Sequence, residues 1–400
     1  MQNQIPKNWQ KVKLGEVVNV YGGGTPSTQI SSYWSGNIPW LTPAELTNYD
    51  SRTIAGTASY VTESGLQNSS AKVMPENSIL LTSRATIGNV VINTIPMATN
   101  QGFINIEPKK VDRDFFYYWL KNNRKYLNQI AIGSTFPELS KSVFKEIDAE
   151  IPENIEVQER IGKFISAFDE KIEVNNKIAK TLEEMAQTIF KKWFVDKNKS
   201  SWEIKKIKDI AKVNKGLSYS SKEISDSKGL PMINLANFLR GGGFSAGGIK
   251  FYTGKYKQTN LVKPGDIVIA MTDLTSNREV IGHPARVPSY SHWDKIIVSL
   301  DVCSLETEDI FVEFLYYLML TRGFSYLMAS SAGGTNVAHL SPKFVESYEF
   351  PLPDNETLKK FQSCVAPIFR KKNLIEIENQ KLAIMRDLLL PKLMKGEIHV

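Results

Sequence analysis

Apolar and polar residues alternate with helical spacing in one long stretch near the middle of the chain. After Ile151-Pro152-Glu153-Asn154, apolar side chains recur at steps of four and three residues, with Asn175 in the one polar slot. The stretch contains no proline, and no glycine after Gly162. This heptad spacing predicts a helix from about Val157 to Phe194, roughly 55 Å long at 1.5 Å per residue.

A weaker copy of the pattern ends the chain, after Leu352-Pro353-Asp354-Asn355. Lys372, Asn379 and Arg386 interrupt it, and Pro391 should break its last turn. An amphipathic helix this long needs a partner for its apolar stripe, so we expect the two helices to pair as an antiparallel coiled coil. The positions expected to pair are Ile165, Phe168, Ile172, Leu182, Ile189, Val365, Ile368, Ile375, Leu382 and Leu389. The alternative is a helix lying on the sheet of its own domain.

The segment before each helical stretch has a different pattern. Short β-type runs, Ser78–Thr82 and Asp266–Ala270, each follow a turn signal. A short helix is expected around 116–120 and another around 315–318. Each half of the chain therefore predicts a mixed α and β domain followed by a long helix, an α+β fold class.

The two halves repeat each other about 200 residues apart. Leu139-Ser140-Lys141 recurs as Leu340-Ser341-Pro342-Lys343, and Leu182-x-x-Met185 recurs as Leu382-x-x-Met385. Two copies are too few for a solenoid and indicate duplication of a whole unit, a pseudo-dimer whose ligand would itself have two parts. The predicted boundaries are 1–150 and 199–350 for the two globular domains, and 151–198 and 351–400 for the two helical segments.

Composition narrows the class of protein. The 400 residues are 42% hydrophobic and carry a net charge of +7, which permits nucleic-acid binding without proving it. Phe314–Leu320, among the longest apolar runs, is far shorter than a membrane span, and the N-terminus lacks an apolar signal core. Cys303 and Cys364 are far apart and form no CxxC. We therefore expect a cytoplasmic protein that has no disulfide framework and makes no membrane contact.

Motifs for enzyme chemistry are not found in the sequence. There is no HExxH, no GxSxG and no metal-ligand spacing among the four histidines. Gly254-Lys255 resembles the end of a phosphate loop, but Tyr256 replaces the required Ser or Thr. No Asn-Pro-Pro-aromatic run of the kind that amino-methyltransferases use is present. These observations disfavour an enzyme.

Taken in order, the landmarks of the chain resemble the DNA-specificity subunit of type I restriction-modification enzymes. No single motif is specific, but the ordered and duplicated set is, and the resemblance covers essentially the full chain. The landmarks are Trp9, Leu14-Gly15-Glu16, Gly23-Gly24-Thr25-Pro26-Ser27, Tyr33-Trp34, Gly36–Leu41, Leu80–Gly88, Asn100-Gln101-Gly102, Gly133-Ser134-Thr135, Ile151-Pro152 and Gln158–Ile161.

The resemblance implies a division of labour. The two globular domains would be target-recognition domains, each reading one half of a split sequence on double-stranded DNA. The helices would be spacers that fix the gap and dock methyltransferase subunits, two of them. Those partners would carry S-adenosylmethionine, and separate restriction subunits would use Mg and ATP, so this chain would bind no cofactor and catalyse nothing. The alternative is a stand-alone tandem DNA-binding or adaptor protein without a methyltransferase partner.

Base readout needs Arg, Lys, Asn, Gln, Ser or Thr on loops that reach a groove of the DNA. The candidates for DNA contact in the first copy are Lys72, Ser83, Arg84, Thr86, Ser134 and Thr135, and those in the second are Arg240, Lys250, Asn277, Arg278, Thr335 and Asn336. Of these, Lys72, Ser134 and Thr135 would contact phosphates. The alternative for each is a solvated surface residue or a structural turn. Tyr33, Trp34 and Trp40 could stack on a flipped base, or could be core aromatics.

Overall fold

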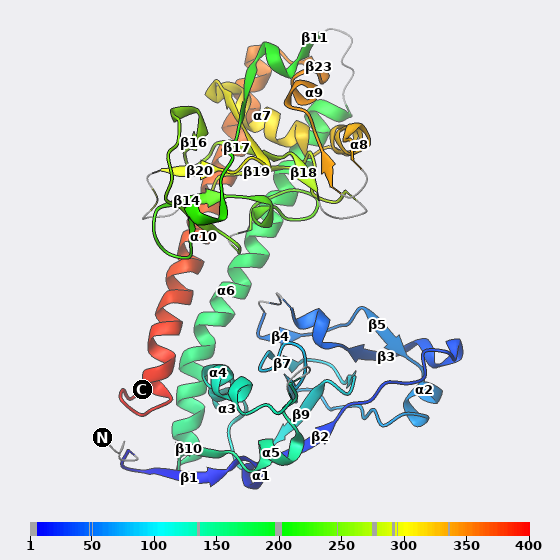
Figure 1. Cartoon of the computed structure of the whole chain (residues 1–400), viewed down its shortest axis with the longest axis vertical. Coiled ribbons are helices and arrows are strands. Elements are labelled where there is room, and N and C mark those ends of the chain that lie inside the picture. Colours follow the sequence, from blue (N-terminus) through cyan, green and yellow to red (C-terminus); the bar gives the residue numbers. More distant parts are fainter. Residues whose placement is uncertain are drawn as a thin grey trace. The chain divides into compact units, whose positions relative to one another are not determined.

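The structure is a computed structural model that describes residues 6–47, 49, 51–133, 137–196, 202–245, 247–273, 278–289, 293, 295–334 and 337–400. Its contacts divide the chain into two compact units (Figure 1). The first unit comprises Met1–Val174 and Asn379–Val400, and the second comprises Asn175–Glu378.

The first half of the chain forms ten strands and six α-helices in the part that is described. In chain order these are β1 (Trp9–Lys13), α1 (Leu14–Val17), β2 (Val18–Gly22), β3 (Trp34–Leu41), β4 (Thr53–Ile54), β5 (Ser59–Val61), α2 (Glu63–Gln67), β6 (Ile79–Thr82), β7 (Val90–Asn93), β8 (Ala98–Thr99), β9 (Phe103–Pro108), α3 (Arg113–Asn122), α4 (Arg124–Gln129), α5 (Lys141–Lys145), β10 (Asp148–Pro152) and α6 (Ile155–Phe190).

The second half follows the same plan. Its elements are β11 (Glu203–Lys206), β12 (Ala211–Lys215), β13 (Ile224–Ser225), β14 (Leu230–Ile233), β15 (Lys250–Tyr252), β16 (Leu261–Val262), β17 (Ile267–Ala270), β18 (Thr272–Asp273), β19 (Pro284–Arg286), β20 (Ile296–Val298), β21 (Val302–Thr307), α7 (Asp309–Met319), α8 (Arg322–Ser331), β22 (Ala338–His339), α9 (Pro342–Glu346), β23 (Glu349–Leu352) and α10 (Asn355–Leu393).

The two globular domains share one topology. The strand order β2-β9-β6-β7-β4 in the first matches β12-β21-β17-β19 in the second, and β4 is an additional edge strand. In each domain the first and last strands also pair with each other, β1 with β10 and β11 with β23. The duplication seen in the sequence is therefore a duplication of the fold, and the predicted α+β class is confirmed.

Both predicted long helices are present. α6 continues beyond Phe190 as a π-helical segment, Lys191–Val195, close to the predicted end. The expectation that Pro391 breaks the second helix is wrong, because α10 continues to Leu393. The proline removes only one intrahelical hydrogen-bond donor, and just two residues of the helix follow it. The buried side chains of Leu390, Leu393 and Met394 hold this last turn in the core.

The helices are antiparallel within each unit. In the first unit Ile161 and Ile165 of α6 share a buried core with Leu390 and Leu393 of α10. In the second unit the end of α6 meets the start of α10, where Ala186 and Phe190 share a core with Phe361 and Val365. Residue numbers thus rise along one helix as they fall along the other.

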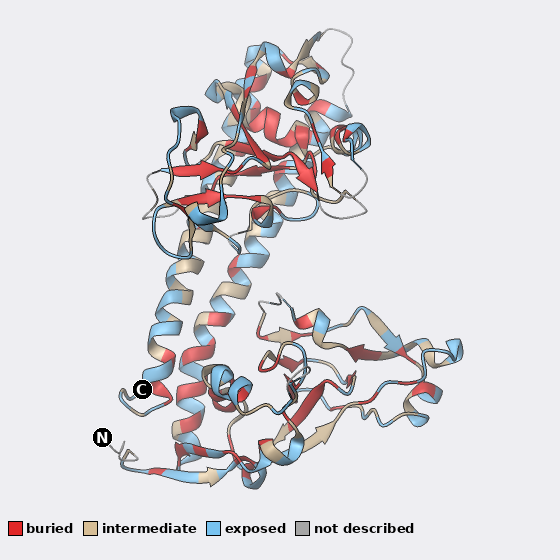
Figure 2. Cartoon of the chain, viewed as in Figure 1, coloured by how far each residue is buried: buried red, intermediate tan, exposed pale blue. Residues whose placement is uncertain are grey.

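Each long helix also packs on a globular domain, so the two interpretations of its apolar stripe are both right. A Cβ on Gly162 of α6 would lie 2.6 Å from the backbone nitrogen of Phe115 on α3, a separation that only glycine permits. The core of the first unit joins α3, α6 and the sheet, and buried residues line this junction (Figure 2). Each compact unit therefore contains part of both long helices.

Candidate nucleic-acid interface

The turn between β6 and β7 exposes Arg84 on the first globular domain. The backbone nitrogen of Thr86 donates to the carbonyl of Arg84 at 2.7 Å, which makes Ala85, with φ +59°, the centre of a γ-turn. The nitrogen of Gly88 closes the turn by donating to the carbonyl of Thr82 at 3.0 Å. The backbone of a non-glycine residue at positive φ is strained, and such strain is common at functional sites.

A second loop lies against this turn. Ile132 and Glu138 exchange backbone hydrogen bonds of 3.0 and 2.9 Å, and the nitrogen of Leu139 donates to the carbonyl of Ser83 at 3.0 Å. Nη2 of Arg84 donates to both carboxylate oxygens of Glu138, each at 2.9 Å. The two side chains are 47% and 40% exposed, and an ion pair this open contributes about 0–1 kcal/mol. A nucleic-acid acceptor could therefore replace Glu138 at small cost.

Two of the predicted contacts in this turn have little access to solvent. Ser83 is only 2% exposed, and its backbone nitrogen donates to the carbonyl of Gly102 at 2.8 Å. The hydroxyl of Thr86 is buried and has no hydrogen-bond partner among the described residues. The side chain of Ser83 and the hydroxyl of Thr86 thus face the interior, and Arg84 is the one of the three that is exposed to solvent.

Two lysines flank the glycine-rich segment of the first domain. The Nζ atom of Lys72 lies 3.6 Å from the centroid of the Tyr21 ring, in a cation–π contact. A Cβ on Gly22 would lie 3.0 Å from Nζ of Lys141. Lys72 is exposed as expected. Lys141 was not among the predicted contacts, although its place in the repeated Leu-Ser-Lys motif could have indicated it as a candidate.

The next two glycines serve packing. A Cβ on Gly23 would lie 1.9 Å from the carbonyl oxygen of Asn100, and one on Gly24 would lie 2.3 Å from the nitrogen of Ala71. The carbonyl of Gly24 accepts the indole Nε1–H of Trp40 at 2.9 Å. Trp40 is buried and meets Trp34 edge-on with ring centroids 4.9 Å apart, which supports the core interpretation of these aromatics.

The second domain has a longer loop at the same place in the fold. The nitrogen of Gly282 donates to the carbonyl of Ala270 at 2.8 Å, and that of Leu340 donates to the carbonyl of Met271 at 2.8 Å. These bonds correspond to those that Gly88 and Leu139 make in the first domain. Residues 271–281 therefore take the place of the shorter segment 83–87 in the chain.

The described part of this loop is anchored to the domain. The carboxylate of Asp273 accepts the backbone nitrogens of Val280 and Ile281 at 2.7 and 3.1 Å. Arg278, at φ +53°, is half-buried, and its Nη1 donates to the carbonyl of Ala329 on α8 at 2.6 Å. This arginine, predicted to contact DNA, thus also ties the loop to α8.

The remaining candidates of the second domain are exposed or undescribed. Arg240 is 76% exposed and pairs with Glu279 at 3.0 Å, which places it beside the long loop. Lys250 is exposed on β15, opposite Met232 of β14. Five predicted positions lie outside the described residues: Ser134, Thr135, Asn277, Thr335 and Asn336.

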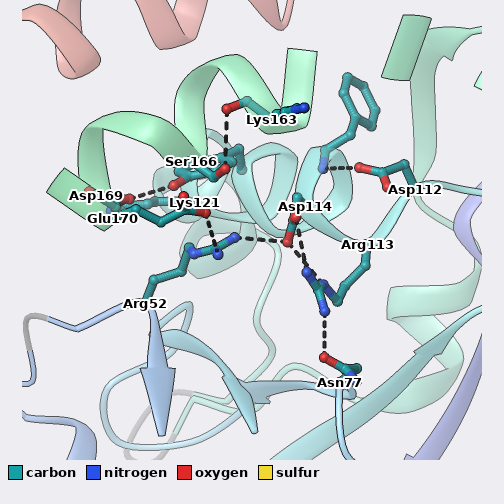
Figure 3. Close-up of polar contacts among 12 residues, drawn as sticks. Arg52, Asn77, Asp112, Arg113, Asp114, Lys121, Lys163, Ser166, Asp169 and Glu170 are labelled. Atoms are coloured by element: carbon teal, nitrogen blue, oxygen red, sulfur yellow. Dashed lines mark hydrogen bonds and ion pairs between the residues drawn. The ribbon is translucent and has the colours of Figure 1, made fainter. Parts of the chain in front are cut away.

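A charged cluster around the buried Arg52, which the sequence did not predict, joins the first domain to α6 (Figure 3). Arg52, just before β4, donates from Nη1 to Asp114 on α3 at 2.8 Å and from Nη2 to Glu170 on α6 at 3.1 Å. Burial lowers the pKa of Arg52, but Asp114, Tyr118 and Glu170 outweigh it and the net shift is upward. The guanidinium therefore stays charged in the folded protein.

Three of the polar interruptions of the two heptad patterns, Asn175, Lys372 and Arg386, make interhelical contacts. Asn175, 1% exposed, donates to Glu378 at 2.9 Å, and Lys372 pairs with Glu183 at 3.0 Å, both in the second unit. In the first unit Arg386 pairs with Asp169. Polar groups at such positions specify the register of a coiled coil. These residues therefore help to pair the two helices, although in the sequence they only interrupt the heptad pattern.

The residues predicted to pair the helices all lie toward the interior. Ile165, Val365 and Ile375 are buried, and the others, Phe168, Ile172, Leu182, Ile189, Ile368, Leu382 and Leu389, are half-buried. Ile165 and Leu389 pack in the core of the first unit, and Ile189, Val365 and Ile368 in that of the second. Part of this stripe therefore packs on a globular domain as well.

The described residues contain no group of three or more His, Cys, Asp or Glu side chains placed to hold a metal ion. No helix within them is both long and apolar enough to cross a membrane.

Comparison with known proteins is consistent across the length of the chain. The family model for the type I restriction modification DNA specificity domain matches residues 6–184 and again 199–384. The specificity subunit of the type I restriction enzyme MjaIX from Methanocaldococcus jannaschii is 33% identical, over 99% of this chain and 95% of that protein. The HindI specificity subunit from Haemophilus influenzae is 24% identical over 82% of this chain and 85% of that protein. The crystal structure of the type I restriction-modification S subunit from M. genitalium shares the fold, with a TM-score of 0.59 at 16% identity over 98% of this chain and 97% of that one.

Proposed function

Because this chain belongs to the family of type I restriction-modification specificity subunits, we propose that it reads a two-part DNA target, with one half-site on each globular domain. The observation that carries the proposal is the pair of topologically equivalent loops, 83–87 and 271–281, which differ in length and residues on a shared scaffold. A scaffold kept while its loops diverge suits two domains that read different bases.

The long helices suit the role of a spacer. Two modules that read one face of B-DNA must be centred about one helical turn, roughly 34 Å, or a related distance apart. A helix pair whose register is fixed by polar contacts can hold such a distance, whereas a flexible linker could not fix it to one base pair. Rigid helices also reduce the entropy lost when the second domain binds.

Repeated, exposed methionines on the helices support docking of two equivalent partners. Met185 of α6 and Met385 of α10 occupy the same position in the repeat, and each is 50% exposed. A core role cannot explain an exposed apolar side chain kept in both copies, whereas Met suits an adaptable protein interface. We propose that these sites bind two methyltransferase subunits that carry S-adenosylmethionine. Restriction subunits using Mg and ATP would join through the complex.

Selection from a random double-stranded DNA library, with the full chain and its methyltransferase subunit, tests the two-part target. Two fixed half-sites separated by a nonspecific gap of constant length are expected. A single continuous sequence, or no sequence preference, would refute the proposal.

The partner proposal has a separate test, the subunit stoichiometry by native mass spectrometry. Met185→Glu and Met385→Glu should each reduce two bound methyltransferase subunits to one. Wild-type chain that binds DNA but no methyltransferase would favour the adaptor alternative.

A further inference from the structure

Arg52 lies where the sheet edge, α3 and α6 of the first unit meet (Figure 3). Its side chain is 9% exposed, and its two terminal nitrogens bond to carboxylates on two different helices, Asp114 at 2.8 Å and Glu170 at 3.1 Å. One guanidinium therefore joins three elements. Its planar fork suits this task, because two donors are held in fixed directions at once.

The helix holds the same segment at a second point. Oε1 of Glu173 accepts the hydroxyl of Ser51 at 2.6 Å and the backbone nitrogen of Arg52 at 2.9 Å. Glu170 and Glu173 are three residues apart and so lie on one face of α6. Both the side chain and the main chain of residues 51–52 are fixed to the helix, and two contacts resist rotation better than one.

The second unit makes a corresponding contact with different residues. Arg286, on the edge strand β19, is 8% exposed and lies 3.8 Å from Glu313 on α7. Its guanidinium carbon lies 3.9 Å from the ring centroid of Phe369 on α10. Asp114 and Glu313 occupy equivalent positions, each just before a buried phenylalanine. The same arrangement thus recurs in both copies: an arginine at the sheet edge contacts an acidic residue on the short helix and a residue of the long helix.

We propose that Arg52 is a positioning residue that clamps the first globular domain to α6 and thereby restricts the gap between the two half-sites. The proposal rests on the proposed two-part target. Lengthening the gap by one base pair moves a half-site by about 3.4 Å and turns it by about one tenth of a helical turn. Hydrogen bonds near 3 Å do not survive such a displacement, so an intact clamp rejects neighbouring gaps.

Selection of the full chain on the random DNA library, read as the distribution of gap lengths, tests the clamp. Arg52→Met should keep both half-site sequences while raising the share of gaps one base pair shorter or longer at least tenfold. The double variant Glu170→Ala/Glu173→Ala removes the helix side of the clamp and leaves the interior of the domain intact, so it should broaden the gap similarly. Arg52→Lys, which keeps the charge but not the fork, should give an intermediate distribution.

Arg113→Met is the matched control. Arg113 also pairs with Asp114, at 2.9 Å, but its other partner is Asn77 of the same domain, so the gap should stay as in the wild type. A merely structural role for Arg52 would weaken binding at every gap alike. If Arg52→Met no longer selects the first half-site sequence, the gap distribution of the Glu170→Ala/Glu173→Ala variant tests the clamp instead. An unchanged gap in that variant, or equal broadening in Arg113→Met, would overturn the clamp alone. Wild-type chain that selects no two-part sequence would overturn the proposed function and the clamp with it.

Discussion

Replacing Arg386 by methionine should destabilise the first unit through the carboxylate that it leaves behind. Arg386 of α10 pairs with Asp169 of α6, and the two side chains are 15% and 9% exposed. Burial raises the pKa of Asp169, but Lys121 and Arg386 together hold that pKa below its usual range. The variant therefore leaves a buried charge with fewer partners.

The structure sets the size of the effect. Removing one partner of a buried ion pair costs about 3–5 kcal/mol. In the variant, Asp169 still accepts a hydrogen bond from the hydroxyl of Tyr118 at 2.6 Å and still lies 3.7 Å from Lys121. We therefore expect the free energy of unfolding to fall by about 2–3 kcal/mol. Replacing Asp169 and Arg386 by leucine and Tyr118 by phenylalanine together should cost less than Arg386→Met alone, because only Lys121, whose side chain is 34% exposed, then loses a partner.

Urea denaturation of the full chain at several pH values measures this effect. A depressed carboxyl pKa contributes stability above the unfolded value, near 4, and this contribution is lost as pH falls through the folded value. The difference between wild type and Arg386→Met should therefore shrink as pH falls below about 4. Lys360→Met on an exposed part of α10 is the control and should change little. A difference that stays constant from neutral pH to acid would refute the electrostatic explanation.

Three further outcomes follow from the structure. Arg84→Ala should reduce selection of the first half-site by about tenfold, the value of one good base contact, and leave the second half-site unchanged in the DNA library assay. Gly23→Ala and Gly216→Ala should each lower the melting temperature, because the added Cβ would lie 1.9 Å from a carbonyl oxygen; equal stability would contradict the packing. Burial raises the pKa of Cys303 to about 12, so iodoacetamide at pH 8 should label only the exposed Cys364 of the folded chain, and stability from Cys303 should fade as pH rises from about 9 toward 12.

The base-contact candidates show where sequence reasoning reaches its limit. Arg84 was separated from Ser83 and Thr86 only by the direction in which each side chain leaves a tight turn. That direction depends on the positive φ of Ala85, and no residue type in the segment indicates a positive φ. The loop that accompanies Arg84 is joined to it through Leu139 and Glu138, more than fifty residues later in the chain.

The sequence by itself determined the duplication and the two long helices, because repeated motifs and helical periodicity can be recognised over short stretches. Only the tertiary structure decided which polar residues are partners. Arg52 and Glu170 are 118 positions apart, and Asp169 and Arg386 are 217 apart. In the sequence, Arg52 is an ordinary arginine of a loop, and Arg386 interrupts a heptad. Both arginines are largely buried and paired in the folded chain, because a charge removed from water must find an opposite charge, and folding alone brings that charge within reach.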